Sequence, residues 1–332
     1  MITILIPTLG KSPWLSEALD SCKLAMRDIE CEVILVTPIL DKEDKRNIEN
    51  VIRKVDIEKC KLLEIEEKGI AEALNSGMKA ASYELVARID DDDLMHRDRL
   101  MTQLRFMNEN PEIAVVGSFT EVIDLNGKCI FTQVFPISHE NIKNRMIFGN
   151  ALSHPSVMLR KSVVLGVGGY KNEYIPCEDY ELWINLSSTA KLANIPLVLT
   201  KYRLHNSQST KVNLRKIQLI TKSLIYRQFD FVLNADLKKS SPEEIVNFVE
   251  KNPKMAVLPS EYKWVKPTRG EHLVSLGKIV LARSLKVHLR SNLWEIIRLV
   301  ALAIYKSPFF TIKAITILIY SKHTSEVLNE FR

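Results

Sequence analysis

The chain has 332 residues, of which 46% are hydrophobic and 26% are charged, so it can bury a large core and is not an intrinsically disordered protein. This length suits one catalytic domain of about 200–250 residues with an appendage. The formal net charge of +6 hides an asymmetry: residues 1–200 carry 23 Lys and Arg against 30 Asp and Glu, and residues 201–332 carry 23 against 10. An acidic first part and a basic second part indicate two separate roles.

The first 120 residues alternate between segments that favour strands and segments that favour helices. Short aliphatic runs predict the strands, and longer charged segments with an apolar face predict the helices. The expected strands are 2–7, 32–36, 61–65, 85–89 and 113–118, and the expected helices are 12–26, 42–54, 70–81 and 97–108. Strands separated by helices of about 10–15 residues predict right-handed βαβ units and a mostly parallel sheet.

The next 90 residues are more mixed. Asn126-Gly127 lies between two apolar runs and predicts a hairpin over residues 120–135. The further elements expected here are a helix over 139–149, a strand over 156–159, a helix over 178–188 and a strand over 197–204. After about residue 211 the chain becomes basic and helical, without strands, so a boundary is expected near 205–215.

Cysteine usage and hydropathy restrict the class of protein. The five cysteines are odd in number, widely spaced and include no CxxC pair, which argues against a disulfide framework and a zinc site and fits a reducing cytosol. The chain has no stretch of about 18 uncharged apolar residues, so no simple transmembrane span is expected.

Four consecutive aspartates, Asp90, Asp91, Asp92 and Asp93, follow the predicted strand 85–89 directly. Adjacent carboxylates repel each other, so such a cluster is costly unless cations share the site. Mg²⁺ and Mn²⁺ take oxygen ligands, usually one or two carboxylates together with substrate phosphates. In an open α/β sheet, ligands bind beyond the carboxyl ends of the strands. This position favours a ligand-binding loop over the alternative, an ordinary acidic surface loop.

A second acidic pair, Glu178 and Asp179, begins the predicted helix 178–188. Acidic residues are common in the first turn of a helix, so the pair alone carries little information. A displacement reaction, however, needs two separate carboxylate groups. One holds a metal and the leaving group, and the other takes a proton from the attacking hydroxyl.

Five sequence blocks, in this order, strongly resemble the family 2 glycosyltransferases. They are 68–77 (KGIAEALNSG), 87–93 (ARIDDDD), 154–158 (HPSVM), 178–183 (EDYELW) and 202–205 (YRLH). The resemblance covers about residues 1–210 and implies the GT-A fold, an α/β arrangement with a nucleotide-binding, Rossmann-like mixed sheet. We therefore expect a catalytic domain over 1–210, with a donor-binding half (1–120) and an acceptor half (121–210), and a basic, helical C-terminal extension over 211–332.

The resemblance also implies an activity and roles for individual residues. The chain would be an inverting enzyme dependent on Mn²⁺ or Mg²⁺ that takes a sugar from a nucleotide-sugar, most simply a UDP-sugar. Asp179 would be the catalytic base with Glu178 beside it, and Asp92 and His205 would bind the metal. The residues expected to contact the donor are Pro7, Thr8, Leu9, Gly69, Asn75, Arg88, Asp90, Asp91, Asp92 and Arg203. Those expected to contact the acceptor are His154, Asp93 and Trp183.

Several of these assignments have plainer alternatives. His154 is equally consistent with a satisfied interior histidine, and Trp183 with a core tryptophan on an amphipathic helix. Two departures from the family pattern leave the nucleobase weakly specified. The segment after the second strand (37–41) lacks the family's acidic turn, and Leu74 stands where the family often has arginine.

The basic tail has two interpretations. Residues 293–321 combine apolar and aromatic runs with Arg298, Lys306 and Lys313, a pattern that favours binding to an anionic membrane surface. Alternatively, these helices pack on the catalytic domain or on a second copy in a homo-oligomer. Nucleic acid is not expected as a partner, because no binding motif accompanies the charge.

The expected acceptor is a glycan, lipid-linked, at the cytoplasmic face of a bacterial membrane, in O-antigen, capsule or exopolysaccharide biosynthesis. Two other functions stay open. A nucleotidyltransferase should carry a Gly-rich basic loop after the first strand, where this chain has a single glycine, Gly10. A non-catalytic nucleotide-sugar-binding partner of a polysaccharide assembly complex would bind the donor without turnover.

Overall fold

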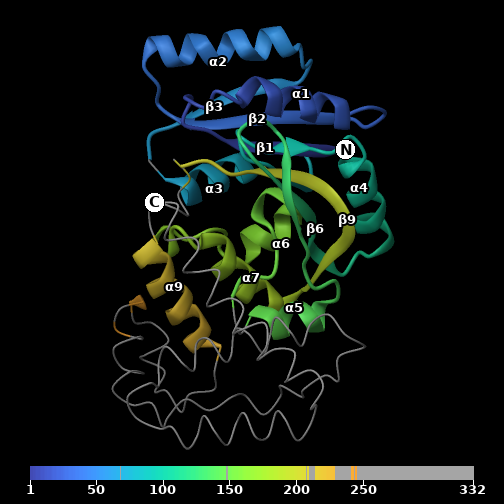
Figure 1. Ribbon diagram of the computed structural model, residues 1–332, viewed down its shortest axis with the longest axis vertical. Coiled ribbons are helices and arrows are strands. Elements are labelled where there is room, and N and C mark those ends of the chain that lie inside the picture. Colours follow the sequence, from blue (N-terminus) through green and yellow to red (C-terminus); the bar gives the residue numbers. More distant parts are fainter. Residues whose placement is uncertain are drawn as a thin grey trace, which may run out of the picture. The chain divides into compact units, whose positions relative to one another are not determined.

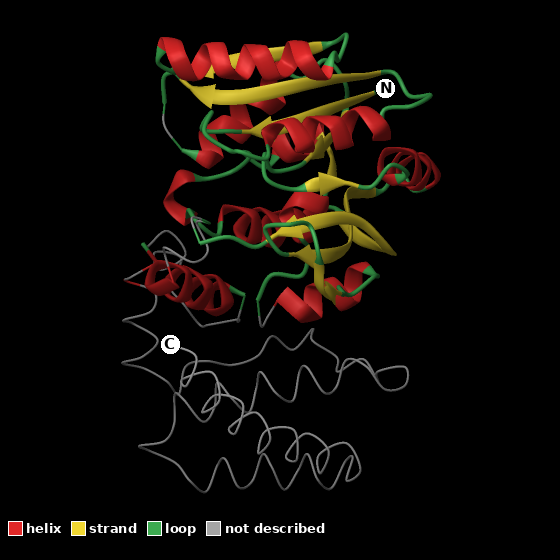
Figure 2. Ribbon diagram, turned by 45° about the horizontal axis from the view of Figure 1, so that its top comes forward, coloured by secondary structure: helices red, strands yellow, loops and turns green. Residues whose placement is uncertain are grey.

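A mixed sheet forms the centre of the part that the computed structural model describes, which is residues 1–67, 69–146, 149–206, 208, 214–228, 241–242 and 244 (Figures 1 and 2). The nine strands found in these residues are β1 (Ile2–Pro7), β2 (Cys31–Pro38), β3 (Cys60–Ile65), β4 (Leu85–Arg88), β5 (Leu94–Met95), β6 (Ile113–Ile123), β7 (Cys129–Gln133), β8 (Met158–Arg160) and β9 (Lys191–Arg203). Eight follow the order β3-β2-β1-β4-β8-β6-β9-β5, and β7 pairs with β6 alone.

The two halves of the sheet differ in direction. Strands β3, β2, β1 and β4 are parallel, whereas β8 is antiparallel to both of its neighbours, β4 and β6. Beyond it, β9 is parallel to β6 and antiparallel to β5. The expected mixed sheet is confirmed, but the expectation that it is mostly parallel holds only for the first half. That half has the helical crossovers that parallel pairs require.

Both faces of the parallel half are covered, by the helices over residues 15–25 and 42–55 on one face and by the helix over 70–80 on the other (Figure 1). In chain order the helices of the described residues are α1 (Leu15–Ala25), α2 (Lys42–Val55), α3 (Ile70–Ala80), α4 (Arg99–Glu109), α5 (His139–Met146), α6 (Lys161–Gly166), α7 (Glu178–Thr189) and α9 (Leu214–Arg227). None of the helices in the described ranges combines the length and hydrophobicity needed to cross a bilayer. All five cysteines are free thiols.

Strand β1 shows how the core is divided. Every residue of β1 is buried, as expected for a strand covered on both faces. Leu5 belongs to one apolar cluster, with α3 and α7, whereas Ile4 and Ile6 belong to another, with α1 and α4. Helix α3 lies very close to the sheet, because a Cβ atom on Gly77 would lie 2.2 Å from Leu5 Cδ1. A glycine is therefore needed where α3 crosses β1.

Most predicted elements occur near their expected positions, with one informative difference in β9. The Asn126-Gly127 hairpin is confirmed, and Gly127 has the positive φ of +81° that the turn needs. Strand β9, however, begins at Lys191 rather than at 197, and pairs with β6 through several register shifts. The expected helices of the basic tail lie outside the described residues, apart from α9. Ile220 and Leu224 of α9 join the apolar cluster that contains Trp183.

The fold brings two strand ends together. The chain adds β2 and β3 on one side of β1 and then β4 on the other, so the strand order reverses between β1 and β4. Ligands of open α/β sheets bind at such a switch point, beyond the carboxyl ends of the strands. Here those ends are occupied by Pro7 and by the aspartates that follow Arg88.

Candidate active site

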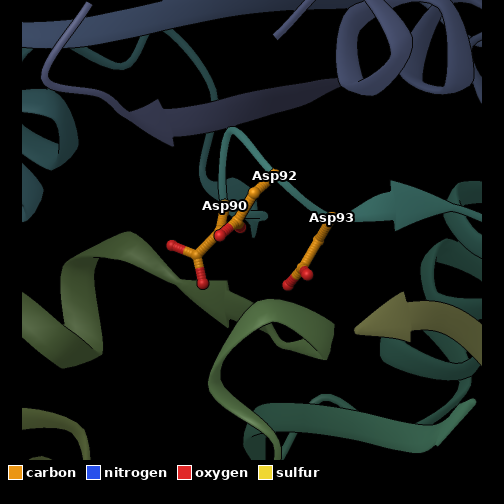
Figure 3. A group of neighbouring side chains, drawn as sticks. All are labelled: Asp90, Asp92 and Asp93. Carbon is orange, nitrogen blue, oxygen red and sulfur yellow. The ribbon is translucent and has the colours of Figure 1, made fainter. Parts of the chain in front are cut away.

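The aspartate loop joins β4 to β5 and gathers three carboxylates. Single side-chain oxygens of Asp90, Asp92 and Asp93 all lie within 4.8 Å of one another. Figure 3 shows the three side chains directed to the same side of the loop. Asp91 points elsewhere: its Oδ2 accepts a hydrogen bond of 2.5 Å from Thr8 Oγ1, and its carbonyl accepts one of 2.9 Å from Ser12 Oγ. Asp91 therefore anchors the aspartate loop to the β1–α1 loop.

The electrostatics of this cluster suit a cation. Burial raises the pKa of Asp90 to about 6 against the opposing charge of Arg88, and the negative charge of Asp92 adds to the rise. Burial, together with Asp90 and Asp92, also holds the pKa of Asp93 well above its usual range. Asp93 Oδ2 is buried and has no hydrogen-bond partner among the described residues. Hard oxygen ligands that repel one another fit Mg²⁺ or Mn²⁺.

The end of β9 closes this cluster from the other side. His205 Nε2 lies 2.5 Å from Asp92 Oδ2, so the two residues expected to bind the metal are adjacent. The backbone N–H of Arg203 donates to Asp93 Oδ1 at 2.8 Å, and its Nε donates to the carbonyl of Asp92 at 2.9 Å. The aspartate loop is thus held by two residues more than 100 positions away.

Arg203 does not have the role that was expected for it. Its side chain is only 1% exposed, and its Nη2 donates to Glu17 Oε2 at 2.8 Å and its Nη1 to the carbonyl of Leu125 at 3.0 Å. All three guanidinium nitrogens of Arg203 donate to protein groups, so the guanidinium is directed at the protein rather than at a diphosphate in this structure. We therefore revise its role from donor contact to support of the aspartate loop.

The second acidic pair lies at the start of α7. Asp179 accepts hydrogen bonds of 2.6 Å from the Asn150 side chain and from the backbone N–H of Tyr180. Burial raises the pKa of Glu178 to about 7, and the neighbouring charge of Asp179 adds to this. The Oε2 atom of Glu178 is buried without a partner in the described part of the chain. Glu178 is therefore buried and Asp179 half-buried, so the pair differs from the solvated first turn of an ordinary surface helix.

The two acidic groups share one electrostatic environment. The charge of Asp179 contributes to raising the pKa of Asp90, and that of Asp90 contributes to raising the pKa of Glu178. The buried Arg88 opposes both rises and forms an ion pair with Asp90. Charges almost 90 positions apart in the sequence thus act on one another, and the guanidinium of Arg88 acts on both groups.

The residues expected to contact the acceptor are placed differently. His154 Nε2 lies 3.0 Å from Tyr170 Oη, and its ring meets Trp183 edge-on at a centroid distance of 5.9 Å. Trp183 is 0% exposed within the apolar cluster and Asp93 is also 0% exposed. Neither offers a surface on which an acceptor could rest, so we withdraw both as acceptor contacts. His154 is half-buried, with its ring held by Tyr170 and Trp183.

Among the other residues expected to contact the donor, some lie near the aspartate loop and one has a structural role instead. Pro7 and Thr8 end β1 beside the aspartate loop, and Leu9 is 71% exposed. Gly69 precedes α3 with a φ of +134°. Both polar atoms of the Asn75 amide are engaged by the backbone of Tyr170, at 2.8 and 2.9 Å. Asn75 therefore ties α3 to the loop before α7, and we revise its donor contact to this structural role.

Sequence reasoning missed several residues that shape the site. Arg99 is fully buried on α4 and donates to the carbonyls of Arg88 and Val157, at 2.8 and 3.0 Å. It therefore fixes the end of β4 just before the aspartate loop. Asn150, Trp14 and Glu17 contact Asp179, His205 and Arg203 respectively. No single-sequence signal distinguishes these side chains from ordinary polar and aromatic residues in loops and helix starts.

Comparisons with known proteins agree with this geometry. Residues 3–164 match the family model described as Glycosyl transferase family 2. The amylovoran biosynthesis glycosyltransferase AmsE of Erwinia amylovora is 31% identical over 173 residues, which cover 49% of this chain and 63% of the relative. An Escherichia coli protein named UDP-Gal:alpha-D-GlcNAc-diphosphoundecaprenol beta-1,3-galactosyltransferase is 35% identical over 141 residues, covering 41% and 49%. The chain therefore spans about half to two thirds of the length of these relatives.

Solved structures share the fold. Staphylococcus aureus TarS 1–349 in complex with UDP-GlcNAc aligns with a TM-score of 0.53 at 16% identity, covering 86% of this chain and 80% of that one. The mannosyltransferase PcManGT from Pyrobaculum calidifontis, in complex with GDP-Man and Mn²⁺, aligns with a TM-score of 0.52 at 14% identity, covering 97% and 87%. At these identities the likeness establishes the GT-A fold.

Proposed function

We propose that the protein transfers a sugar, with inversion, from a nucleotide-sugar to a glycan acceptor, because residues 3–164 match the family model described as Glycosyl transferase family 2. The observation that carries the proposal is the convergence of the aspartate loop and the Glu178–Asp179 pair on one site around Arg88. Transfer by displacement needs these two groups on opposite sides of the reacting carbon.

The proposed base is Asp179. An acceptor hydroxyl has a pKa far above 7 and attacks poorly until a carboxylate takes its proton as the new bond forms, a contribution of about 10²–10⁴ in rate. The bonds from Asn150 and from the backbone of Tyr180 fix the orientation of the Asp179 carboxylate. Attack from the face opposite the leaving group would invert C1, so an α-linked donor would give a β-linked product.

The aspartate loop would hold the donor. Asp90 lies at the switch point of the sheet, where it would face the ribose, and Pro7 and Thr8 would contact the nucleotide. A divalent ion, Mn²⁺ or Mg²⁺, held by Asp92 and His205 would offset the charge that develops on the departing diphosphate. The short distance between these two side chains and the oxygen-rich cluster support this assignment.

The donor and acceptor classes follow from the relatives. One relative is named for transfer from UDP-Gal to a GlcNAc-diphosphoundecaprenol, and two others for amylovoran and O-antigen biosynthesis. We infer a UDP-sugar donor and a lipid-linked glycan acceptor, at the cytoplasmic face of a bacterial membrane, in surface polysaccharide assembly. An acceptor carried on a lipid would bring the enzyme to that membrane.

A panel of nucleotide-sugars with Mn²⁺ or Mg²⁺ tests this function. Ligands that bind the folded protein raise its melting temperature, so UDP-sugars should raise it in the presence of metal, and transfer should release UDP. Formation of a nucleotide-sugar and pyrophosphate from a nucleoside triphosphate and a sugar 1-phosphate, in a parallel assay, would instead indicate a nucleotidyltransferase. Stabilisation by a UDP-sugar without turnover on any lipid-linked acceptor would indicate a non-catalytic partner, and no stabilisation by any nucleotide-sugar would contradict the proposal.

A further inference from the structure

We propose that Trp14 is a positioning residue of the active site, which holds Asp92 in place through both Arg203 and His205. The inference rests on the proposed function, because it concerns the carboxylate to which that function assigns the metal. It adds to the site a residue at the start of α1, which lies outside both the aspartate run and the YRLH block.

The first observation is that one indole contacts both residues that hold Asp92. The Trp14 and His205 ring centroids are 5.0 Å apart, with the planes tilted by 38°. The Arg203 guanidinium carbon lies 5.3 Å from the centroid of the same indole. His205 in turn contacts the side chain of Asp92, and Arg203 Nε binds its carbonyl. Asp92 is thus held at two points by groups that both lie against Trp14.

The second observation is that apolar packing does not account for this tryptophan. Trp14 is half-buried and belongs to neither of the two apolar clusters, whereas Trp183 is fully buried in one of them. Its neighbour Leu15, by contrast, is buried in the core. The indole is therefore placed at the edge of the core, against charged and polar groups of the site.

Hydrogen bonds at the start of α1 fix the backbone of Trp14. Trp14 is the N-cap residue of α1, and its carbonyl accepts the bond from Ala18 N–H at 2.9 Å. Its own N–H donates to Ser12 Oγ at 3.3 Å, and Ser12 Oγ donates to the carbonyl of Asp91. One turn later, Glu17 accepts from Arg203 Nη2. The backbone beneath the indole is therefore tied to the same aspartate loop.

An aromatic ring suits this role better than an aliphatic side chain. The negative face of an indole attracts a guanidinium, an interaction that an aliphatic residue of similar size lacks. Aromatic pairs with tilted planes gain energy beyond their buried area. Groups outside the ligand shell that orient metal ligands typically change metal affinity about 10–100-fold when they are removed.

Mn²⁺ affinity measured by electron paramagnetic resonance, in the presence of UDP, tests the inference with the full-length protein. We expect Trp14→Ala and Trp14→Leu to weaken Mn²⁺ binding about tenfold, and Trp14→Phe to restore most of it. Phe106→Ala is the matched control: Phe106 is a half-buried aromatic near the end of α4, and its side chain packs against an apolar cluster. This control should lower the melting temperature and leave Mn²⁺ affinity unchanged.

The outcomes separate the inference from the function on which it rests. Mn²⁺ affinity of Trp14→Leu equal to that of the wild type would overturn the positioning role while leaving the metal-dependent reaction intact. Equal loss of affinity in Trp14→Phe and Trp14→Ala would also overturn it, since an aromatic face would then be irrelevant. A wild-type protein that binds no Mn²⁺ would refute the metal-dependent function, and the inference with it.

Discussion

His205 and Asp92 are separated by 113 positions in the sequence, yet Nε2 of the first lies 2.5 Å from Oδ2 of the second. The pairing follows from the sheet: β9 runs beside β6 and pairs at Lys201 with Leu94, just after the aspartate loop. The next residues of the chain therefore reach the loop from its far side. Any ion held by Asp92 would therefore meet the ring nitrogen of His205, which follows β9 in the chain.

Asp179→Asn should abolish transfer and leave donor binding intact. Asparagine has nearly the same shape and can still accept a hydrogen bond from Tyr180 N–H, but it cannot take a proton. We expect kcat to fall by about 10²–10⁴, with the affinity for the nucleotide-sugar unchanged in calorimetry. Transfer at the wild-type rate would remove Asp179 as the base.

Asp92→Asn should weaken Mn²⁺ binding more than tenfold, because the substitution removes a charged oxygen ligand next to His205. Asp98→Asn provides the control, since Asp98 is an exposed carboxylate at the start of α4. Mn²⁺ titration followed by electron paramagnetic resonance should separate the two variants. Equal Mn²⁺ affinity in both would place the metal elsewhere.

The metal-free protein should become less stable as pH rises from about 4.5 to 7. Burial raises the pKa of Asp91 and of Glu178 to about 7, so the folded state keeps protons that the unfolded chain has already lost. Where the unfolded state binds fewer protons, the free energy of unfolding falls with pH, and one pKa unit corresponds to about 1.4 kcal/mol.

Melting temperatures measured across that pH range, with and without Mn²⁺, check this prediction. Glu178→Gln should flatten the pH dependence, because an amide has no proton to lose. Mn²⁺ should raise the melting temperature more at pH 7 than at pH 5, since only ionised carboxylates bind it well. The lowered pKa values of His154 and His139, caused by burial, act in the opposite direction, so the comparison with Glu178→Gln is decisive. The same pH dependence in the wild type and in Glu178→Gln would contradict the acidic site.

Arg203→Lys should destabilise the protein although the charge is kept. A lysine has one nitrogen, so it cannot replace bonds from three nitrogens to Asp92, Leu125 and Glu17. A hydrogen bond from a charged donor contributes about 1.5–3 kcal/mol, and less where the partner is exposed, as Glu17 is. Lys201→Gln, which breaks an exposed pair with Glu121, should cost less than about 1 kcal/mol. Urea denaturation compares the two variants.

The parallel half of the fold was predictable from the sequence because its signals are local. Continuous aliphatic runs such as those of β1 and β2 indicate buried strands by themselves. The run of aspartates after β4 likewise indicates a ligand site without reference to the rest of the chain. The second half lacked such signals: β8 has three residues, and the first part of β9 is interrupted by Pro196.

The supports of the site were not predictable for a different reason. Arg99 and Arg203 are charged residues that lie fully inside the protein, whereas arginine is almost never fully buried unless it is paired. Their partners are backbone carbonyls and a glutamate brought together only by the fold. Asn75 was misassigned because a polar residue in a family block suggests a ligand, and the structure gives its amide to the Tyr170 backbone.

The tip of the β6–β7 hairpin is joined to the site through the main chain alone. Arg203 Nη1 binds the carbonyl oxygen of Leu125, whose own side chain is exposed. The side chain of Leu125 can consequently be exchanged, for a label or a new recognition surface, without removing this bond, whereas Asp124 and Gly127 shape the turn itself. Inserting or deleting even one residue there would shift the carbonyl of Leu125. Arg203 would then move, and with it the aspartates to which Arg203 is bonded.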